Sequence, residues 1–299
     1  MSVMSILDAY INLMPVTLLQ SAIYAFAALG IMIPFRLLSF PDLTVEGSFP
    51  LGGCVAAALI AANIDPVAAT VAAMLAGVVA GLVTATIHLT LRLNTLLCGI
   101  LVLTMLFSID IRIMGKPNTA LFAHATIFDN LLGTLGSSLL VRTAAVGVLL
   151  AGLALLLLWF FRTEIGMALR AVGASHSMAR AQGLSVGRYT LLGLGLAGAL
   201  CALSGALLAQ NQAFADVGMG FGIVVNGLGS VVVGEQLIGR GSLGRQLMAP
   251  IVGAFVYYQI VSLALAVGLQ PSDLKLVTAV FVLIMLGVPM LAGVRQRPI

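Results

Sequence analysis

The sequence predicts an all-α, polytopic helical membrane protein with about nine transmembrane spans (8–10). Hydrophobic residues occupy 61% of the 299 positions and charged residues only 8%, whereas about a quarter of the residues in a soluble globular domain are charged. Apolar segments of the ~18–20 residues that cross a bilayer recur along the chain. These observations exclude a soluble domain. We attribute the net charge of +4 to the orientation of the chain in the membrane rather than to a nucleic acid partner.

Nine apolar segments are expected to span the membrane. The clearest are 144–161, 249–269 and 276–294, which contain no charged residue. The second and seventh segments are less regular because glycines interrupt them. The outer connection between the fourth and fifth spans contains a half-apolar stretch, 120–132, that we expect at the membrane interface. In chain order the spans are 13–35, 47–62, 66–91, 93–111, 141–161, 189–209, 217–234, 247–269 and 274–294.

The basic residues in the connections predict the orientation. Lys and Arg are enriched in the cytoplasmic loops of membrane proteins. If the 162–188 connection is cytoplasmic, ten basic residues lie inside and four outside, and the N-terminus is outside and the C-terminus cytoplasmic. The inside group is Arg36, Arg92, Arg162, Arg170, Arg180, Arg188, Arg240, Arg245, Arg295 and Arg297, and the outside group is Arg112, Lys116, Arg142 and Lys275.

The order of the spans predicts two inverted four-helix repeats within a single domain, 1–299. The first four spans (13–115) start and end outside, and the last four (189–294) start and end inside, so the blocks have opposite orientations. The linking span 141–161 and the polar connection 162–188 join them.

In each block the second span is the one that glycines interrupt, which favours a transport route at these places. A short similarity supports the pairing: residues 40–45 and 214–219 precede the two spans, and each has Phe first and Asp third. The alternative is that the glycines only permit close helix packing, as we expect for Gly77 with Gly81 and for Gly195 with Gly198.

Two carboxylates stand near the start of the second span. Asp42 and Glu46 are four residues apart and share a face if the segment is helical. One interpretation is capping of the helix N-terminus, and the other is direct participation in gating. The residues that we expect along the translocation pathway or its gate are Phe40, Asp42, Thr44, Glu46, Phe49, Phe214, Phe221 and Asn226.

The basic connection between the fifth and sixth spans is expected to form two short helices. The first covers 164–172 and ends at Gly173. The second covers 176–182, with Ser175 as its N-cap and Gly183 as a left-handed stop.

An apolar stripe of Met178, Ala181 and Leu184 beside Arg180 would suit insertion into a cleft of a soluble partner. The alternative is an amphipathic helix that lies on lipid headgroups. The candidate docking residues are Glu164, Gly166, Arg170, Gly173, Ser175, Met178, Ala179, Arg180, Gly183 and Leu184.

The sequence indicates no catalytic, metal or cofactor site. The histidines have no carboxylate at ligand spacing, and no G-x-x-x-x-G-K-[ST] loop is present. The cysteines lie in apolar stretches, and we expect them to be small buried residues. We expect Asp110 to pair with Arg112 near the outer face. The histidines are His88, His124 and His176, and the cysteines are Cys54, Cys98 and Cys201.

Three segments resemble motifs of a known family. Residues 42–47 (Asp-Leu-Thr-Val-Glu-Gly) are similar to the D-L-[ST]-V-x-G signature of ribose-type ABC importer permeases. Residues 166–173 and 178–184 resemble the coupling-helix segment of the branched-chain amino acid and ribose permeases. Residues 239–244 resemble their G-G-R-G-S turn with slight departures. The resemblance covers essentially the whole chain and is nearest the single-permease systems paired with tryptophan- or tyrosine-type binding lipoproteins, with one N-terminal span fewer than the ribose permeases.

This resemblance implies a non-catalytic pore subunit of an ABC importer for a small solute, an amino acid (aromatic or branched-chain) or a related compound. It also implies a homodimer, a cytoplasmic ABC ATPase dimer that contacts the candidate docking residues, and an extracytoplasmic substrate-binding protein. The location would be the bacterial inner membrane. An ion-coupled secondary transporter with inverted repeats is the alternative, and it predicts ionisable residues inside the spans.

Overall fold

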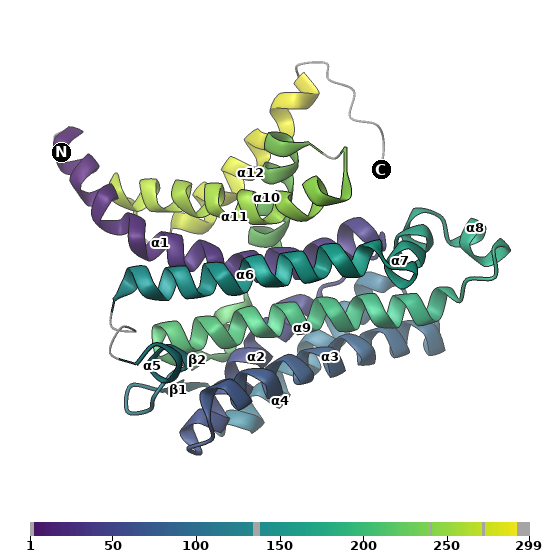
Figure 1. Ribbon diagram of the computed structural model, residues 1–299, viewed down its shortest axis with the longest axis horizontal. Helices are drawn as coiled ribbons and strands as arrows, with labels where there is room; N and C mark the ends of the chain where they lie inside the picture. The colour runs from purple at the N-terminus through teal and green to yellow at the C-terminus, as the bar shows by residue number, and fades with distance from the viewer. Residues whose placement is uncertain (1–2, 134–137, 240, 271–272, 292–299) are drawn as a thin grey trace.

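The computed structural model describes residues 3–133, 138–239, 241–270 and 273–291, which form an almost entirely helical protein (Figure 1). Arg240, Arg295 and Arg297, which enter the prediction of orientation, lie outside these ranges. The elements are α1 (Val3–Met32), η1 (Ile33–Leu37), α2 (Thr44–Ala61), α3 (Pro66–Leu91), α4 (Thr95–Met114), β1 (Asn118–Ala120), α5 (Ile127–Leu132), α6 (Leu139–Arg162), α7 (Glu164–Ala174), α8 (His176–Ala181), α9 (Val186–Gln212), β2 (Phe214–Asp216), η3 (Val217–Gly220), α10 (Ile223–Ile238), α11 (Leu243–Ala266) and α12 (Leu274–Leu291).

The predicted all-α polytopic fold is confirmed. Among the described residues, 8 helical segments are long and apolar enough to cross a membrane, and α12 contains a shorter apolar stretch, Leu276–Met285. The sequence did not predict the antiparallel pair of β1 and β2, in which Thr119 lies opposite Ala215. This pair connects the end of the first block to the seventh span.

Helix α1 ends in a turn of π-helix at Pro34. A proline lacks an N–H and displaces the carbonyl group four residues before it, so the turn widens. The N–H of Leu38 bonds the carbonyl oxygen of Ile33, five residues back, at 3.0 Å. Ser39 then takes a positive φ of 50°, and the N–H of Phe40 bonds the Pro34 carbonyl oxygen at 2.8 Å. The chain therefore turns tightly from η1 into the segment that leads to α2.

Helix α9 lies at the centre of the packing and contacts α1, α2 and α3. Small residues permit these contacts. A Cβ at Gly77 would lie 2.3 Å from the Gly198 carbonyl oxygen, and a Cβ at Gly81 would lie 2.1 Å from that of Leu194. The close packing that we expected around Gly77 and Gly81 is confirmed. At Gly195, in contrast, the nearest side-chain atom is at an ordinary 3.5 Å.

The second expected span is not interrupted, and here the close-packing alternative is correct. Helix α2 is continuous from Thr44 to Ala61 although it contains Pro50. Gly52 lets α9 approach, because a Cβ there would lie 2.0 Å from the Ala202 carbonyl oxygen.

The seventh span is interrupted, as the sequence predicted. β2 and η3 lie beside α2 before α10 begins at Ile223. A Cβ at Gly220 would lie 2.1 Å from the Glu46 carbonyl oxygen. Pro50, four residues after Glu46, has no N–H for this carbonyl group. The non-helical part of the span therefore packs on α2 where the proline weakens the α2 hydrogen-bond ladder.

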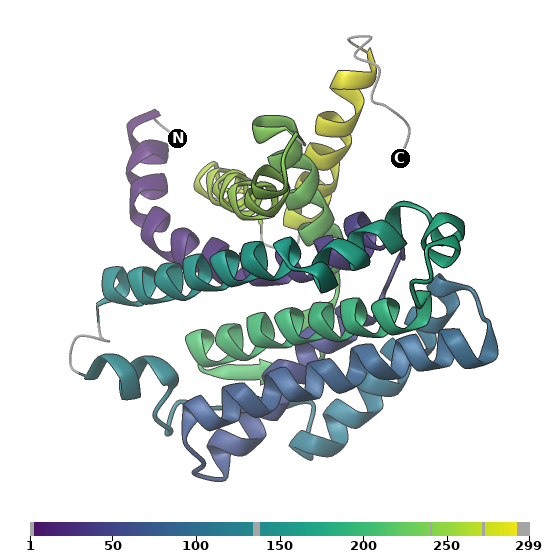
Figure 2. The same cartoon turned by 45° about the vertical axis from the view of Figure 1, so that its right-hand side comes forward.

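The remaining helices complete the bundle. α11 packs along α1 and α10, α12 contacts α10 and α11, and α6 lies on α1 (Figures 1 and 2). α7 and α8 lie at one end of the long helices, and α5, β1 and β2 lie at the opposite end. The candidate docking helices are thus separated from the α5 end by the length of the bundle.

Candidate functional site

The candidate docking segment (residues 163–188) folds as two capped helices. The hydroxyl of Thr163 accepts a hydrogen bond from the Gly166 N–H at 3.4 Å and starts α7. The hydroxyl of Ser175 accepts one from the Met178 N–H, also at 3.4 Å, and starts α8. The expected N-cap at Ser175 is confirmed.

Gly173 lies inside α7, which continues to Ala174, so the prediction that Gly173 ends this helix is wrong. The absence of a side chain at Gly173 instead allows α7 to pack closely against η1. A Cβ at Gly173 would lie 1.7 Å from the Leu37 carbonyl oxygen at the end of η1. The Ser39 hydroxyl donates to the Gly173 carbonyl oxygen at 3.2 Å, and Leu169 is fully buried. Helix α7 is therefore packed directly on the π turn that ends α1.

Helix α8 carries the exposed tip of the candidate docking segment. Met178 is 65% exposed and Arg180 is exposed, whereas Ala179 between them is buried. The Leu184 N–H bonds the Ala179 carbonyl oxygen at 2.9 Å, and Gly183 has the expected left-handed φ of +79°. The tip presents an apolar side chain next to a cation.

Among the other candidate docking residues, two contact the end of α6 and one is exposed. A Cβ at Gly166 would lie 2.3 Å from the Phe160 carbonyl oxygen. Arg170 turns back and donates to the Phe161 carbonyl oxygen at 3.2 Å. Both residues hold α7 against the end of α6, while Glu164 is exposed in the first turn of α7.

The first group of gate candidates is buried beside the π turn. The Phe40 ring meets the His88 ring edge-on at 5.0 Å between centroids, and the hydroxyls of Thr44 and Thr84 are 2.8 Å apart. Asp42 Oδ1 accepts the N–H of Thr44, the first residue of α2, at 2.8 Å, although Leu43 and not Asp42 is the N-cap residue of this helix. Burial raises the pKa of the Asp42 carboxyl, and the hydrogen bonds from Thr44 act in the opposite direction.

The similarity between residues 40–45 and 214–219 has a structural counterpart. Asp216 Oδ1 accepts the Gly218 N–H at 2.7 Å, the same bond to the second following residue that Asp42 makes. Phe214, however, lies half-buried on β2 opposite Ala120, whereas Phe40 contacts His88 near the C-terminal end of α3. The two aromatic candidates therefore do not form one site.

Glu46 fixes the interruption of the seventh span. Its Oε1 accepts the N–H of Gly222 at 2.5 Å, and Gly222, with φ of +89°, is the residue that precedes α10. Phe221 beside it is 61% exposed, and Asn226 follows one turn later. The structure thus brings Glu46 to Gly222, next to Phe221, at the start of α10, whereas Asn226 lies one turn further along and bonds Tyr257.

An aromatic stack connects Phe49 to α11. The Phe49 ring is stacked on Tyr24 at 5.8 Å, and Tyr24 is stacked on Tyr258 at 4.6 Å. The Tyr257 hydroxyl donates to Asn226 Oδ1 at 2.7 Å. The space between Tyr24, Tyr258 and Asn226 is too narrow for a water molecule, so this part of the bundle is closed. The three tyrosines were not among the predicted residues, although Tyr257 and Tyr258 stand out within an otherwise aliphatic span.

A salt bridge between Arg36 and Glu235 links η1 to α10. Arg36 Nη2 lies 2.7 Å from Glu235 Oε2, and these side chains are 21% and 8% exposed. Arg36 precedes Leu37, the residue that Gly173 contacts. Helix α7, the π turn and α10 are therefore connected in series.

In the described part of the chain, eight helical segments long enough to cross a bilayer, one of them interrupted, and an exposed helix at the end of the bundle define a multi-pass membrane transport protein. The chain belongs to the family described as branched-chain amino acid transport system / permease component, whose sequence model matches residues 14–289.

Two curated relatives are similar over most of the chain. The tyrosine transport system permease protein of Clostridioides difficile (strain R20291) is 37% identical over 268 residues, which cover 90% of this chain and 88% of the relative. An uncharacterized protein of Rickettsia prowazekii (strain Madrid E) is 31% identical over 285 residues, which cover 92% and 97%. No solved structure matches the chain.

Proposed function

We propose that the chain is the transmembrane permease subunit of an ABC importer and forms the pathway for an aromatic or branched-chain amino acid in a bacterial inner membrane. The family description and the name of the Clostridioides difficile relative support this substrate class. ATP hydrolysis belongs to a partner subunit, since the proposed role of this chain is the pore.

One observation carries the proposal: the exposed tip on α8 is connected through packed contacts to the segment that precedes α2. Met178 and Arg180 project from α8, α7 is packed on the π turn through Gly173, and the π turn leads into the buried segment around Asp42. A force on α8 would therefore reach the start of α2. Residues 163–188 would form the surface that binds an ATPase dimer, which closes when it binds ATP.

The proposed assembly has a second copy of the chain, a cytoplasmic ABC ATPase dimer and an extracytoplasmic substrate-binding protein. The N-terminus lies outside and the C-terminus in the cytoplasm, by the distribution of basic residues. Two inverted repeats, 13–115 and 189–294, build the permease. Reciprocal packing supports them: α3 of the first block packs on α9 of the second, and α11 of the second packs on α1 of the first.

Changing the tip of α8 tests the docking role. We expect Arg180→Glu combined with Met178→Asp to abolish substrate-stimulated ATPase activity in the reconstituted complex. Retention of the ATPase on the purified permease should fall more than about tenfold, because an interface hot spot contributes about 2 kcal/mol or more. Pull-down and ATPase assays measure these effects.

The matched control makes the same kinds of change at the other end of the bundle. Lys116→Glu combined with Phe122→Asp also reverses a charge and replaces an exposed apolar side chain, since Phe122 is 79% exposed. ATPase retention should be normal in this control. If both double variants retain the ATPase equally, α8 is not the docking site.

Asp110 supplies the one observation that favours ion-coupled transport. Its carboxylate is fully buried in α4, and neither oxygen has a hydrogen-bond partner among the described residues, so the expected pair with Arg112 is wrong. Buried ionisable groups at membrane depth are commonly functional.

Asp110→Leu separates the two functions. In an ABC importer, we expect this variant to keep ATP-driven uptake and to gain about 1–3 kcal/mol of unfolding free energy, because an unsatisfied buried polar group is removed. Uptake of tyrosine and of leucine into proteoliposomes, together with thermal unfolding, measures both effects. Ion coupling would be supported by two results together. Asp110→Leu would lose uptake, and a proton or sodium gradient would drive uptake by the unsubstituted chain without the ATPase.

A further inference from the structure

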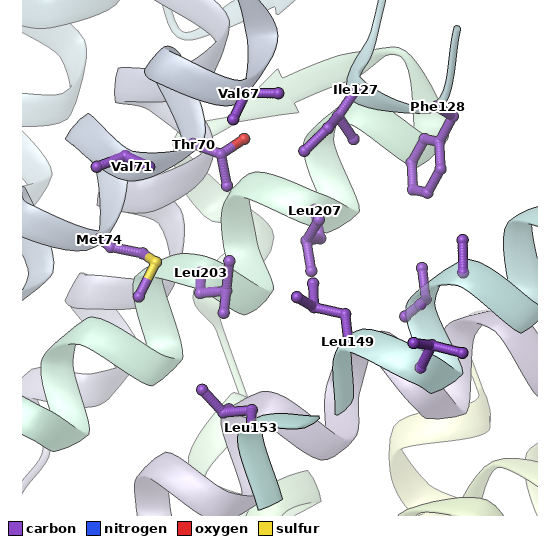
Figure 3. Close-up of a pocket in the computed structure, with 13 residues that line it drawn as sticks. Val67, Thr70, Val71, Met74, Ile127, Phe128, Leu149, Leu153, Leu203 and Leu207 are labelled. Carbon is purple, nitrogen blue, oxygen red and sulfur yellow. The ribbon is translucent and has the colours of Figure 1, made fainter. Parts of the chain in front are cut away.

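An apolar groove lies between α3 and α6 at the end of the bundle that holds α5. α6 packs on α1 and α11 while α3 packs on α9, so the facing sides of α3 and α6 stay apart. Figure 3 shows Leu203 and Leu207 of α9 between Met74 of α3 and Leu149 of α6. The groove has a volume of about 490 Å³, within the ~300–1,000 Å³ range of small-ligand pockets.

The chemistry of the groove excludes a polar ligand. Among the described residues, Thr70 is the only polar one that lines it, and this hydroxyl is already satisfied. It donates to the Pro66 carbonyl oxygen at 2.8 Å and accepts from Gln210 Nε2 at 2.9 Å. The Gln210 Oε1 accepts the Ile127 N–H at 2.9 Å, which fixes α5 at the end of the groove. Every surface left open is hydrocarbon.

A cation stands at the α5 end of the groove. The Arg142 guanidinium lies over the ring of Phe128, a lining residue, at 5.4 Å from its centroid. Asp129 Oδ1 holds Arg142 at 3.5 Å, and Asp129 Oδ2 is occupied by the N–H and hydroxyl of Thr126 at 2.9 and 2.7 Å. Arg142 is a quarter exposed, so an anion can approach it from the membrane surface.

The length of the groove distinguishes its occupants. The lining residues of α6 run from Ala145 to Leu153, and Arg142 lies about one turn before them. From the level of Arg142 to that of Leu153 the helix rises about 16 Å. This is half of the ~30 Å hydrocarbon core and therefore the depth of one leaflet. A transmembrane helix of another protein would need a groove along the full thickness. An acyl chain that hangs from a headgroup at the level of Arg142 ends where the groove ends.

The geometry points to a phospholipid site: one acyl chain occupies the groove between α3, α6 and α9, and its phosphate lies at Arg142. This acyl chain fills the gap that separates α6 from α3. Lipid tails are as apolar as the lining, so confinement in the groove and the contact with Arg142, rather than the hydrophobic effect, distinguish this lipid from its neighbours in the bilayer.

Filling the groove tests the site. Ala145→Trp places a bulky ring at a lining position, and Ala144→Trp makes the same change at the adjacent exposed residue that does not line the groove. After extensive washing in mild detergent, the phospholipids that remain bound are counted by mass spectrometry. We expect the unsubstituted chain and Ala144→Trp each to hold one more phospholipid per chain than Ala145→Trp holds. Equal retention by all three proteins would overturn the proposal.

A second measurement does not depend on the folding of Ala145→Trp. Trp159 is the only tryptophan, so a Trp159→Phe background can carry a single reporter, at Leu149 in the groove or at Leu155 on the exposed face of α6. In bilayers with increasing brominated phosphatidylglycerol, the reporter at 149 should be quenched at a lower brominated fraction than the reporter at 155. Arg142→Gln should remove this difference.

Two outcomes would contradict the lipid site. Identical quenching curves at 149 and 155 would mean that only bulk lipid reaches the groove. Quenching at 155 without quenching at 149 would mean that protein, such as a second copy of the chain, covers it.

Discussion

Replacing Gly173 with alanine is expected to reduce substrate uptake by about 5- to 150-fold, the range of a coupling free energy of about 1–3 kcal/mol. The added Cβ would lie 1.7 Å from the Leu37 carbonyl oxygen, and a backbone group cannot move aside as a flexible side chain does. Helix α7 must therefore shift away from the π turn. ATP-driven uptake of tyrosine and leucine by proteoliposomes that contain the complete transporter measures the effect.

The matched control is Gly152→Ala in α6. Nothing lies within 4 Å of a Cβ at Gly152, so this variant should transport normally and gain about 0.5–1 kcal/mol of helix stability. Gly173→Ala should still retain the ATPase, because α8 and its tip are unchanged. Normal uptake by Gly173→Ala would show that the contact between α7 and η1 does not transmit the motion.

Local signals in the sequence were enough to predict the spans and the caps. Ser175 and Gly183 delimit α8 because their preferences are local, and a charge-free stretch such as 144–161 leaves a membrane helix as its stable structure. Gly173 misled the prediction for the same reason. A glycine near a helix end favours a stop, and only the neighbouring carbonyl group of Leu37, more than a hundred residues away in sequence, reveals its packing role.

The candidate site was predicted only in part, because the features that were not predicted depend on contacts between residues far apart in the sequence. The interruption of the seventh span was correctly predicted from its glycines, whereas α2 accommodates Pro50 and Gly52 because α9 and η3 pack on it. Glu46 was predicted as a cap or a gate residue. Its bond to Gly222, 176 residues away, assigns it to the interruption. The periodicity of apolar residues along the sequence does not indicate a contact between residues so far apart.

Removing either partner of the Arg36–Glu235 salt bridge is expected to have the second large effect. Arg36→Ala or Glu235→Ala should lower the unfolding free energy by about 3 kcal/mol, because the remaining charge is left largely buried. This figure is at the low end for buried pairs, since Arg36 is 21% exposed. The exchanged pair, Arg36→Glu with Glu235→Arg, should recover part of the loss. Thermal unfolding of the unsubstituted chain, the two single alanine variants and the double alanine variant forms a double-mutant cycle, and the exchanged pair is measured beside it.

The pair of Arg142 with Asp129 is the control for this cycle. Its atoms are 3.5 Å apart and Asp129 is 47% exposed, so water and salt screen the charges and the coupling energy should be at most about 1 kcal/mol. Similar coupling energies for the two pairs would contradict a special role for Arg36 and Glu235.

The exchanged pair also tests whether the salt bridge transmits motion. Arg36 lies on the π turn that α7 contacts, and Glu235 lies near the end of α10, the helix that begins at the break fixed by Glu46. If the bridge transmits movement from α7 to α10, uptake should fall in both single variants and recover with the exchanged pair. If stability recovers but uptake does not, the bridge only holds the two helices together, and the contact of Gly173 with η1 remains as the path to the gate.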